Sequence, residues 1–153
     1  MDAAPTTFAN LPVDAELGLP VPFACGTDDP YGAPADGPSG RHLDKRRVTQ
    51  CALSRICGVC GAGLGRPIAF LGTEQELGRN AFHFPPTHRE CAESLVREYA
   101  GATGPVLGQD PAPAEWVVVT TSSFEFVRPT REDTDRRPTF EPHALLGVSP
   151  ALD

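Results

Sequence analysis

The sequence of 153 residues predicts one small α+β domain. The stretch 116–127 is rich in β-branched and aromatic residues, which gives the strongest strand signal in the chain. Two segments without proline or glycine, 42–55 and 87–100, carry apolar residues at helical spacing. A chain of this length forms one modest domain, or a smaller one with loose ends.

Charge and proline content divide the chain into three parts. Thirteen Lys and Arg against 20 Asp and Glu give a net charge of −7, yet the segment 1–40 has six acids and no Lys or Arg. The segment is also rich in Pro and Gly, so we expect residues 1–40 to be largely extended or disordered. A zinc-binding α+β domain is expected over 41–127. A charged, partly docked tail is expected over 128–153.

Several functional classes are disfavoured by these features. The acidic balance argues against a general nucleic-acid coat protein, although the region 41–100 is mildly basic. No apolar run approaches the roughly 18–20 residues that span a bilayer. The N-terminus lacks the positive start and apolar stretch of a secretory signal, so a cytoplasmic location is expected.

The first elements follow from local patterns. An apolar patch at 17–23 either docks on the domain or belongs to a flexible tail. A helix is expected over 42–55, with Ser39 as a possible N-cap and Val48, Cys51 and Ala52 on one face.

A hairpin is expected next. The segment 66–72 is typical of a strand that begins with proline, 73–78 of a turn, and 79–84 of a returning strand. In that strand His83 points away from its phenylalanine neighbours, which favours an exposed histidine.

A second helix follows Pro85-Pro86. Thr87 as N-cap and Glu90 three residues later match a capping box, and Gly101 suits the position just beyond the helix end. The expected buried face contains Cys91, Leu95 and Tyr99. The stretch 116–127 forms either one bent strand or two strands joined near 122–123. A short docked element is expected at 139–146.

Four residues form a metal-ligand pattern, C-x2-C-x27-H-x2-C: Cys57, Cys60, His88 and Cys91. Two thiolates can converge from a CxxCG turn, while His and Cys three apart lie on the same side of a helix. Three Cys and one His make a closed tetrahedral set, typical of one structural Zn²⁺. The competing interpretation is a redox pair of Cys57 and Cys60, with His88 only capping the helix.

The order of knuckle, hairpin and helix with a second ligand pair resembles a treble-clef zinc finger. The chain also resembles a group of small proteins of unknown function from actinobacteria and their phages, most clearly at 51–61, 63–70, 85–93 and 116–121. The resemblance covers about 19–150 and is tight only over 51–95. It implies a fold and zinc binding, and no activity.

The other cysteines have plain interpretations. An odd total of five argues against a disulfide framework. Cys51 is expected to pack beside the metal site, with an accessory thiol as the alternative. Cys25 is expected to be a free or packed thiol.

Positive charge gathers near the first helix at Lys45, Arg46, Arg47 and Arg55. This pattern suggests contacts with nucleic acid or a partner, or simply a solvated helix face. No phosphate loop, dinucleotide fingerprint or GxSxG motif is present.

The leading hypothesis is therefore a Cys3His zinc module that acts as a non-enzymatic protein-interaction or regulatory adaptor. We expect the strand region 116–127 to offer an open edge to an unknown protein partner. The alternatives are a nucleic-acid-binding zinc finger with an Arg-rich helix, a thiol-based redox sensor and a His-metal finger nuclease.

Overall fold

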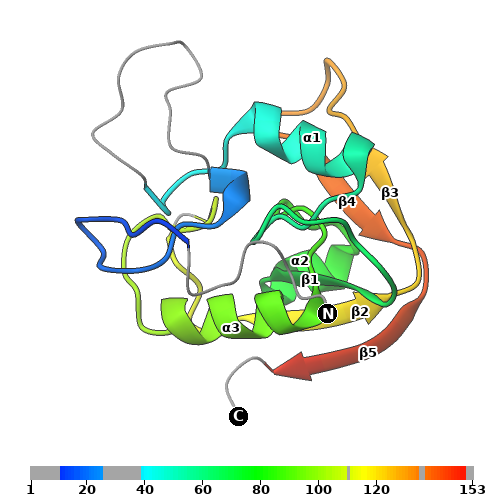
Figure 1. The fold of residues 1–153 in the computed structure, drawn as a ribbon. Coiled ribbons are helices and arrows are strands. Elements are labelled where there is room, and N and C mark those ends of the chain that lie inside the picture. Colours follow the sequence, from blue (N-terminus) through cyan, green and yellow to red (C-terminus); the bar gives the residue numbers. More distant parts are fainter. Residues whose placement is uncertain (1–10, 26–38, 110, 135–136, 151–153) are drawn as a thin grey trace.

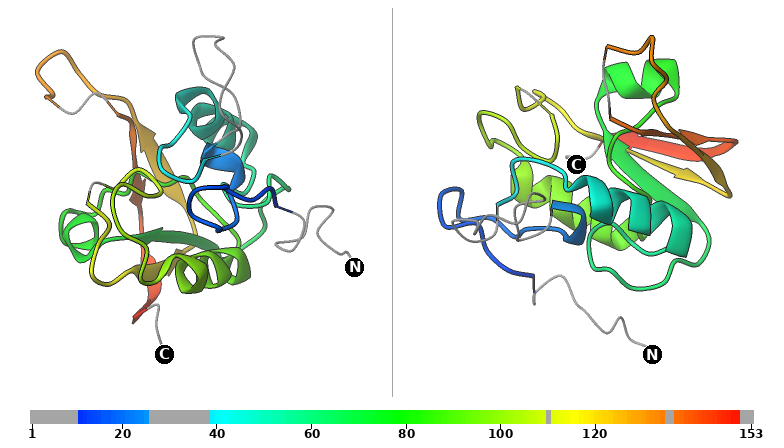
Figure 2. Two further views of the ribbon diagram at one scale, coloured as in Figure 1. Left: turned by 90° about the vertical axis from the view of Figure 1, so that its left-hand side faces the viewer. Right: turned by 90° about the horizontal axis from the view of Figure 1, so that it is seen from above.

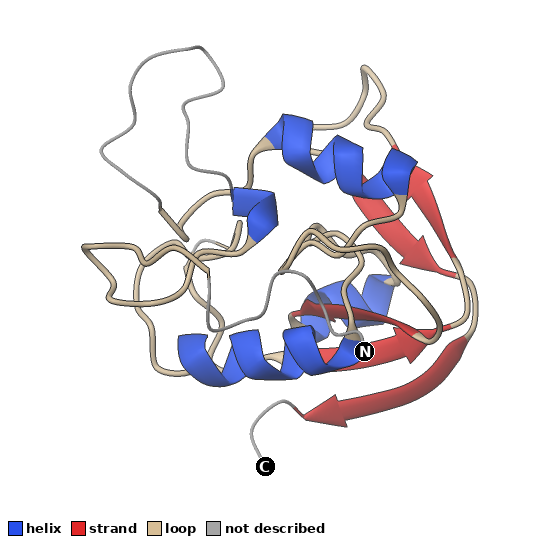
Figure 3. Cartoon of the chain, viewed as in Figure 1, coloured by secondary structure: helices blue, strands red, loops and turns tan. Residues whose placement is uncertain are grey.

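The computed structural model describes residues 11–25, 39–109, 111–134 and 137–150. It shows a mixed α+β fold with two small sheets (Figures 1 and 3). The elements in chain order are η2 (Phe23–Cys25, a 3₁₀ helix), α1 (Lys45–Ser54), β1 (Ile68–Gly72), α2 (Glu74–Arg79), α3 (Arg89–Tyr99), β2 (Val117–Thr121), β3 (Phe124–Val127), β4 (Thr139–Pro142) and β5 (Leu145–Pro150).

The larger sheet is antiparallel in the order β1-β2-β5. Val119 lies at its centre, opposite Phe70 on one side and Val148 on the other. The expectation of an open strand edge is therefore wrong for β2, which is paired on both sides. Its residues 117–119 are buried, as is Trp116 just before it.

The second sheet pairs β3 with β4, so 116–127 forms two strands in different sheets. Aromatic rings join the two sheets. The Phe70 ring of β1 lies 5.7 Å from that of Phe124 and 5.9 Å from that of Phe140. Helix α3 packs against β1 and β2, with Leu95 and Tyr99 buried as expected (Figure 1).

The predicted hairpin is not formed. The segment 73–78 contains most of α2, where Thr73 and Glu76 form a capping box, and Asn80 ends the helix with φ of 55°. The returning strand at 79–84 is reduced to one bridge, between Phe82 and Phe140. The partner of β1 is instead β2, whose run of valines is the stronger strand former.

Both helix starts differ from expectation. Asp44, not Ser39, caps α1, because its carboxylate accepts a hydrogen bond from the Arg46 amide at 2.9 Å. His88 is the N-cap residue of α3 and makes no side-chain cap. The Thr87 hydroxyl donates to the Ala69 carbonyl at 3.1 Å instead, so the capping box with Glu90 is wrong.

The apolar patch near the N-terminus docks on the domain. Phe23 and Ala24 donate backbone hydrogen bonds to the carbonyls of Val59 and Gly58, each at 2.9 Å. The Tyr99 hydroxyl donates to the Pro20 carbonyl at 2.7 Å. Within the segment 1–40 that was expected to be largely extended or disordered, residues 1–10 and 26–38 lie outside the described residues.

The C-terminal part adds the strands β4 and β5 to the two sheets, which is more than the short docked element expected there. Figure 2 shows these strands running beside β3 and β2 in two further views. Among the described residues, no helix combines the length and apolar character needed to cross a membrane.

Candidate metal centre

The first ligand pair lies on a turn between α1 and β1. The Cys57 amide donates to the Ala62 carbonyl at 2.7 Å, and the Gly61 amide donates to the Cys57 carbonyl at 2.9 Å. Gly61 has φ of +78°, a conformation that favours glycine. These bonds close the turn around Cys57 and Cys60.

The second pair lies at the start of α3. Two contacts fix this segment: the Gly58 amide of the knuckle donates to the Pro86 carbonyl at 2.8 Å, and Thr87 exchanges two backbone hydrogen bonds with Ala69 of β1. Backbone contacts therefore do what the predicted hairpin was expected to do. They bring His88 and Cys91 to the knuckle.

The structure brings all four predicted ligands together. One ligand atom from each of Cys57, Cys60, His88 and Cys91 lies within 4.8 Å of the others. The Nδ1 atom of His88 is 3.5 Å from the Cys60 sulfur and 3.7 Å from the Cys91 sulfur. A tetrahedral ion with bonds of about 2.3 Å to sulfur and about 2.05 Å to nitrogen separates such ligands by about 3.6 Å. The spacing therefore fits one metal ion.

The imidazole of His88 is oriented for this role. Its Nε2 lies 2.9 Å from the Gly63 carbonyl oxygen, which can only accept, so Nε2 carries the proton. The lone pair is then on Nδ1, which faces the sulfurs. Metal-binding histidines are commonly held by such an outer hydrogen bond.

The clustered sulfurs shift one another's pKa in opposite directions. Burial raises the pKa of Cys57, but hydrogen bonds from the Cys60 and Cys91 thiols and from backbone amides outweigh it and lower this pKa to about 3. The same contacts with Cys57 and Cys60 raise the pKa of Cys91. One thiolate is thus favoured while a further one is opposed, and a bound divalent cation removes that opposition.

Cys51 and Cys25 are not among the four grouped ligands, although Cys51 lies near Cys57. Cys51 is fully buried on α1, and burial together with nearby Cys57 raises its pKa to about 12. Cys25 is also buried, and burial raises its pKa. Both therefore remain protonated at neutral pH and are poor nucleophiles.

The four cationic residues near α1 have different surroundings. The Arg47 guanidinium lies over the Phe23 ring at 4.6 Å, and that of Arg55 over the Phe124 ring at 5.2 Å. Lys45 and Arg46 are exposed. Two of the four thus cover aromatic rings, with the guanidinium groups held there by cation–π contacts.

His83 is buried, contrary to the expectation of an exposed strand histidine. Its Nδ1 atom lies 2.8 Å from the Glu76 carboxylate oxygen Oε2 and forms a buried hydrogen bond with it. The reason is that 79–84 is not a strand, so its side chains do not alternate. The Thr73-x-x-Glu76 pattern matches the capping box that starts α2, so it could have predicted a helix here in place of a turn.

The fold and the cluster define a mixed α+β protein with a Cys3His group that can hold a metal ion. No protein-family model matches the chain, and neither a curated protein nor a solved structure matches it. A function must therefore be argued from the site itself.

Proposed function

We propose that the Cys3His cluster binds one structural Zn²⁺. The observation that carries this proposal is the convergence of the four ligand atoms to within 4.8 Å of one another. Three thiolates and one imidazole suit zinc and complete a tetrahedron, which leaves no open position for a substrate.

The position of the cluster explains why a structural ion is useful. The knuckle accepts backbone hydrogen bonds from Phe23 and Ala24 of the N-terminal segment. Cys57 follows α1 closely, and Cys91 lies in α3. One ion would therefore tie three distant segments, and structural zinc contributes folding free energy on the order of 10 kcal/mol.

We further propose that the zinc-stabilised domain is a non-enzymatic protein-interaction or regulatory adaptor, which shares the knuckle and the ligand-bearing helix of treble-clef fingers but not their hairpin. Support comes from the closed ligand set and from β5 at the outside of the larger sheet. Leu146 and Val148 of this strand are 63% and 49% exposed. Edge strands with apolar side chains can pair with another chain.

The alternatives receive less support from the described residues. Arg47 and Arg55 are engaged with aromatic rings, which weakens the case for nucleic-acid binding through α1. The raised pKa of Cys51 weakens the redox-sensor hypothesis. For a His-metal finger nuclease, His88 is already placed among the cluster's thiols.

A matched pair of histidine variants tests the proposal. We expect the purified protein to contain one zinc per chain, His88→Gln to lose most of it, and His42→Gln, at an exposed position, to keep it. Elemental analysis measures the stoichiometry. Full folding without bound metal would contradict a structural role for zinc.

The same proteins serve as bait for a partner. We expect the wild type and His42→Gln to capture the same protein from host lysate and His88→Gln to lose it, because the interaction surface depends on the zinc-held fold. Mass spectrometry identifies the captured protein. Equal capture by His88→Gln would separate any interaction from the zinc site and contradict the adaptor model.

A further inference from the structure

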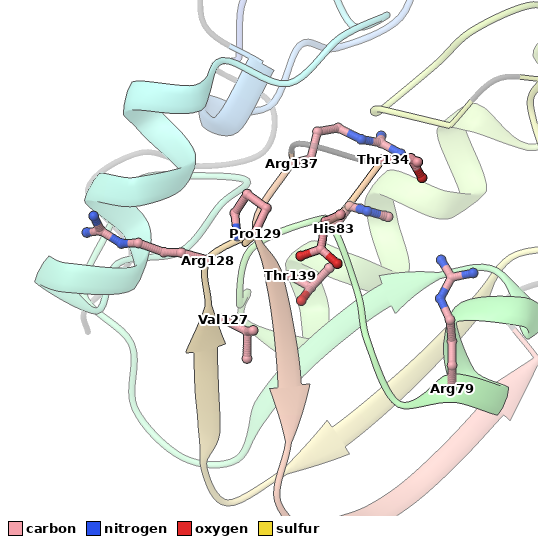
Figure 4. Close-up of a pocket in the computed structure, with 9 residues that line it drawn as sticks. Arg79, His83, Val127, Arg128, Pro129, Thr134, Arg137 and Thr139 are labelled. Atoms are coloured by element: carbon pink, nitrogen blue, oxygen red, sulfur yellow. The ribbon is translucent and has the colours of Figure 1, made fainter. Parts of the chain in front are cut away.

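A hollow of about 380 Å³ lies apart from the four metal ligands, between α2, the end of β3 and the segment before β4. Three arginines line it: Arg79, Arg128 and Arg137. Figure 4 shows the guanidinium groups of Arg79 and Arg137 on the same side as His83, while that of Arg128 points away. Its guanidinium lies over the Phe126 ring, at 5.6 Å.

A second hollow of about 330 Å³ shares His83 and Arg137 with the first. It adds Lys45 at the start of α1 and an apolar lining from Leu43, Val48 and Pro138. His83 and Arg137 therefore lie where a cationic hollow meets a partly apolar one. Together the two volumes fall in the usual range for a small-molecule site, about 300–1,000 Å³.

Glu76 fixes His83 at this junction. Its Oε2 atom accepts hydrogen bonds from the His83 amide at 3.0 Å and from Nδ1 at 2.8 Å. Its Oε1 accepts from the Thr73 amide and the Gln109 side chain. Burial raises the pKa of Glu76, but the hydrogen bonds from His83 outweigh it, so the carboxylate stays ionised. His83 is only 5% exposed and has a defined ring orientation.

The charge of the lining favours an anion. Arg79 is exposed and forms no ion pair in the part of the chain that the structure describes. The Arg137 guanidinium donates to the Gly108 carbonyl at 2.6 Å, which holds it near the junction. Asp133 is the acidic residue among the described lining of the two hollows, and it accepts a hydrogen bond from the Thr130 amide at 2.7 Å.

We propose that the two hollows together bind a small phosphate-bearing molecule of about nucleotide size. The phosphate lies against Arg79, Arg137 and His83, and the less polar part of the molecule lies over Leu43, Val48 and Pro138. Arginine matches phosphate oxygens with paired, charge-assisted hydrogen bonds. This binding role lies outside the zinc-dependent function proposed above.

Calorimetric titration of the full, zinc-loaded chain with each of the four nucleoside 5′-monophosphates tests the proposal. We expect at least one of the four nucleotides to bind. Arg79→Gln should weaken the binding of that nucleotide about tenfold, because the variant loses a charge-assisted contact. Arg97→Gln, an exposed arginine of α3 away from both hollows, is the matched control and should bind as the wild type does. Because Arg79 is exposed, its variant should keep its melting temperature and zinc content.

Three further probes locate the binding energy. The matching nucleoside and inorganic phosphate should each bind at least about tenfold more weakly than the nucleotide, because each reaches only one hollow. No binding of any monophosphate at millimolar concentration, or equal binding by Arg79→Gln, would overturn the proposal. If inorganic phosphate bound as tightly as the nucleotide, the second hollow would contribute nothing to binding, which would contradict its proposed role. A short single-stranded oligonucleotide that binds more than tenfold tighter would assign the surface to nucleic acid instead.

Discussion

At the scale of single residues, His88 links the metal cluster to the backbone around it. Its Nδ1 faces two sulfurs at 3.5 and 3.7 Å, while Nε2 donates to the Gly63 carbonyl. The ligand identities were predictable from the sequence, because a CxxC knuckle followed by an HxxC pair is a typical pattern of metal ligands. The hydrogen bond to Gly63 was not predictable, because it depends on how the knuckle folds.

The buried carboxylate of Glu76 is the second important group at this scale, because it accepts hydrogen bonds from Thr73, His83 and Gln109. Glu76→Gln should destabilise the protein by about 1–3 kcal/mol, since it disrupts buried hydrogen bonds from Thr73, His83 and Gln109 to the carboxylate. Glu74→Gln is the control, an exposed carboxylate in the first turn of the same helix that should change stability by less than about 0.5 kcal/mol. Urea unfolding measures both values.

The pH dependence of that difference has a defined sign. The folded-state pKa of Glu76 is lowered from 4.5, so its contribution is complete above about pH 4.5 and is lost as the pH falls through the folded-state pKa. The wild type and Glu76→Gln should therefore converge in stability on acidification. A difference that stays constant down to pH 3 would contradict the ionised state of Glu76.

At the scale of elements, local sequence patterns predicted several helices and strands, but they missed α2 and did not predict which strands pair. The two long helices and the strands at 68–72 and 117–121 follow from composition and spacing. The partner of β1 was not predictable, because β2 lies more than 40 residues later in the chain. The expected hairpin was wrong for the same reason: a nearby run at 79–84 resembled a strand, but β2 and the Ala69–Thr87 bridge use both edges of β1.

The contact between the knuckle and the segment before α3 replaces that hairpin, and a glycine makes it possible. A Cβ atom at Gly58 would lie 2.7 Å from the Pro85 side chain, whereas one at Gly63 would meet nothing within 4 Å. Gly58→Ala should therefore cost about 1–3 kcal/mol in stability and weaken zinc binding, because it pushes the two ligand pairs apart.

Gly63→Ala is the matched control for that variant. It keeps the backbone carbonyl that His88 uses, so stability and zinc affinity should stay close to those of the wild type. Thermal unfolding and competition with a zinc-binding dye measure both quantities. Equal behaviour of the two variants would show that the close approach at Gly58 does not position the ligands.

At the scale of the whole molecule, the two proposed binding regions share one small fold. The cluster lies between the end of α1 and the start of α3, while the hollows lie near α2, the strands β3 and β4 and the start of α1. The net charge of −7 describes neither region, because six of the acids lie in residues 1–40, and the described lining of the hollows has four Lys or Arg against one acid.

X-ray absorption at the zinc edge of the purified protein is the most direct test of the central claim. Three sulfur ligands at about 2.3 Å and one nitrogen ligand at about 2.0–2.1 Å are the expected first shell. Any zinc that His88→Gln keeps should lack this nitrogen ligand, and the zinc of His42→Gln should retain it. A shell with fewer than three sulfurs, or with an oxygen ligand in the wild type, would contradict a closed Cys3His zinc site.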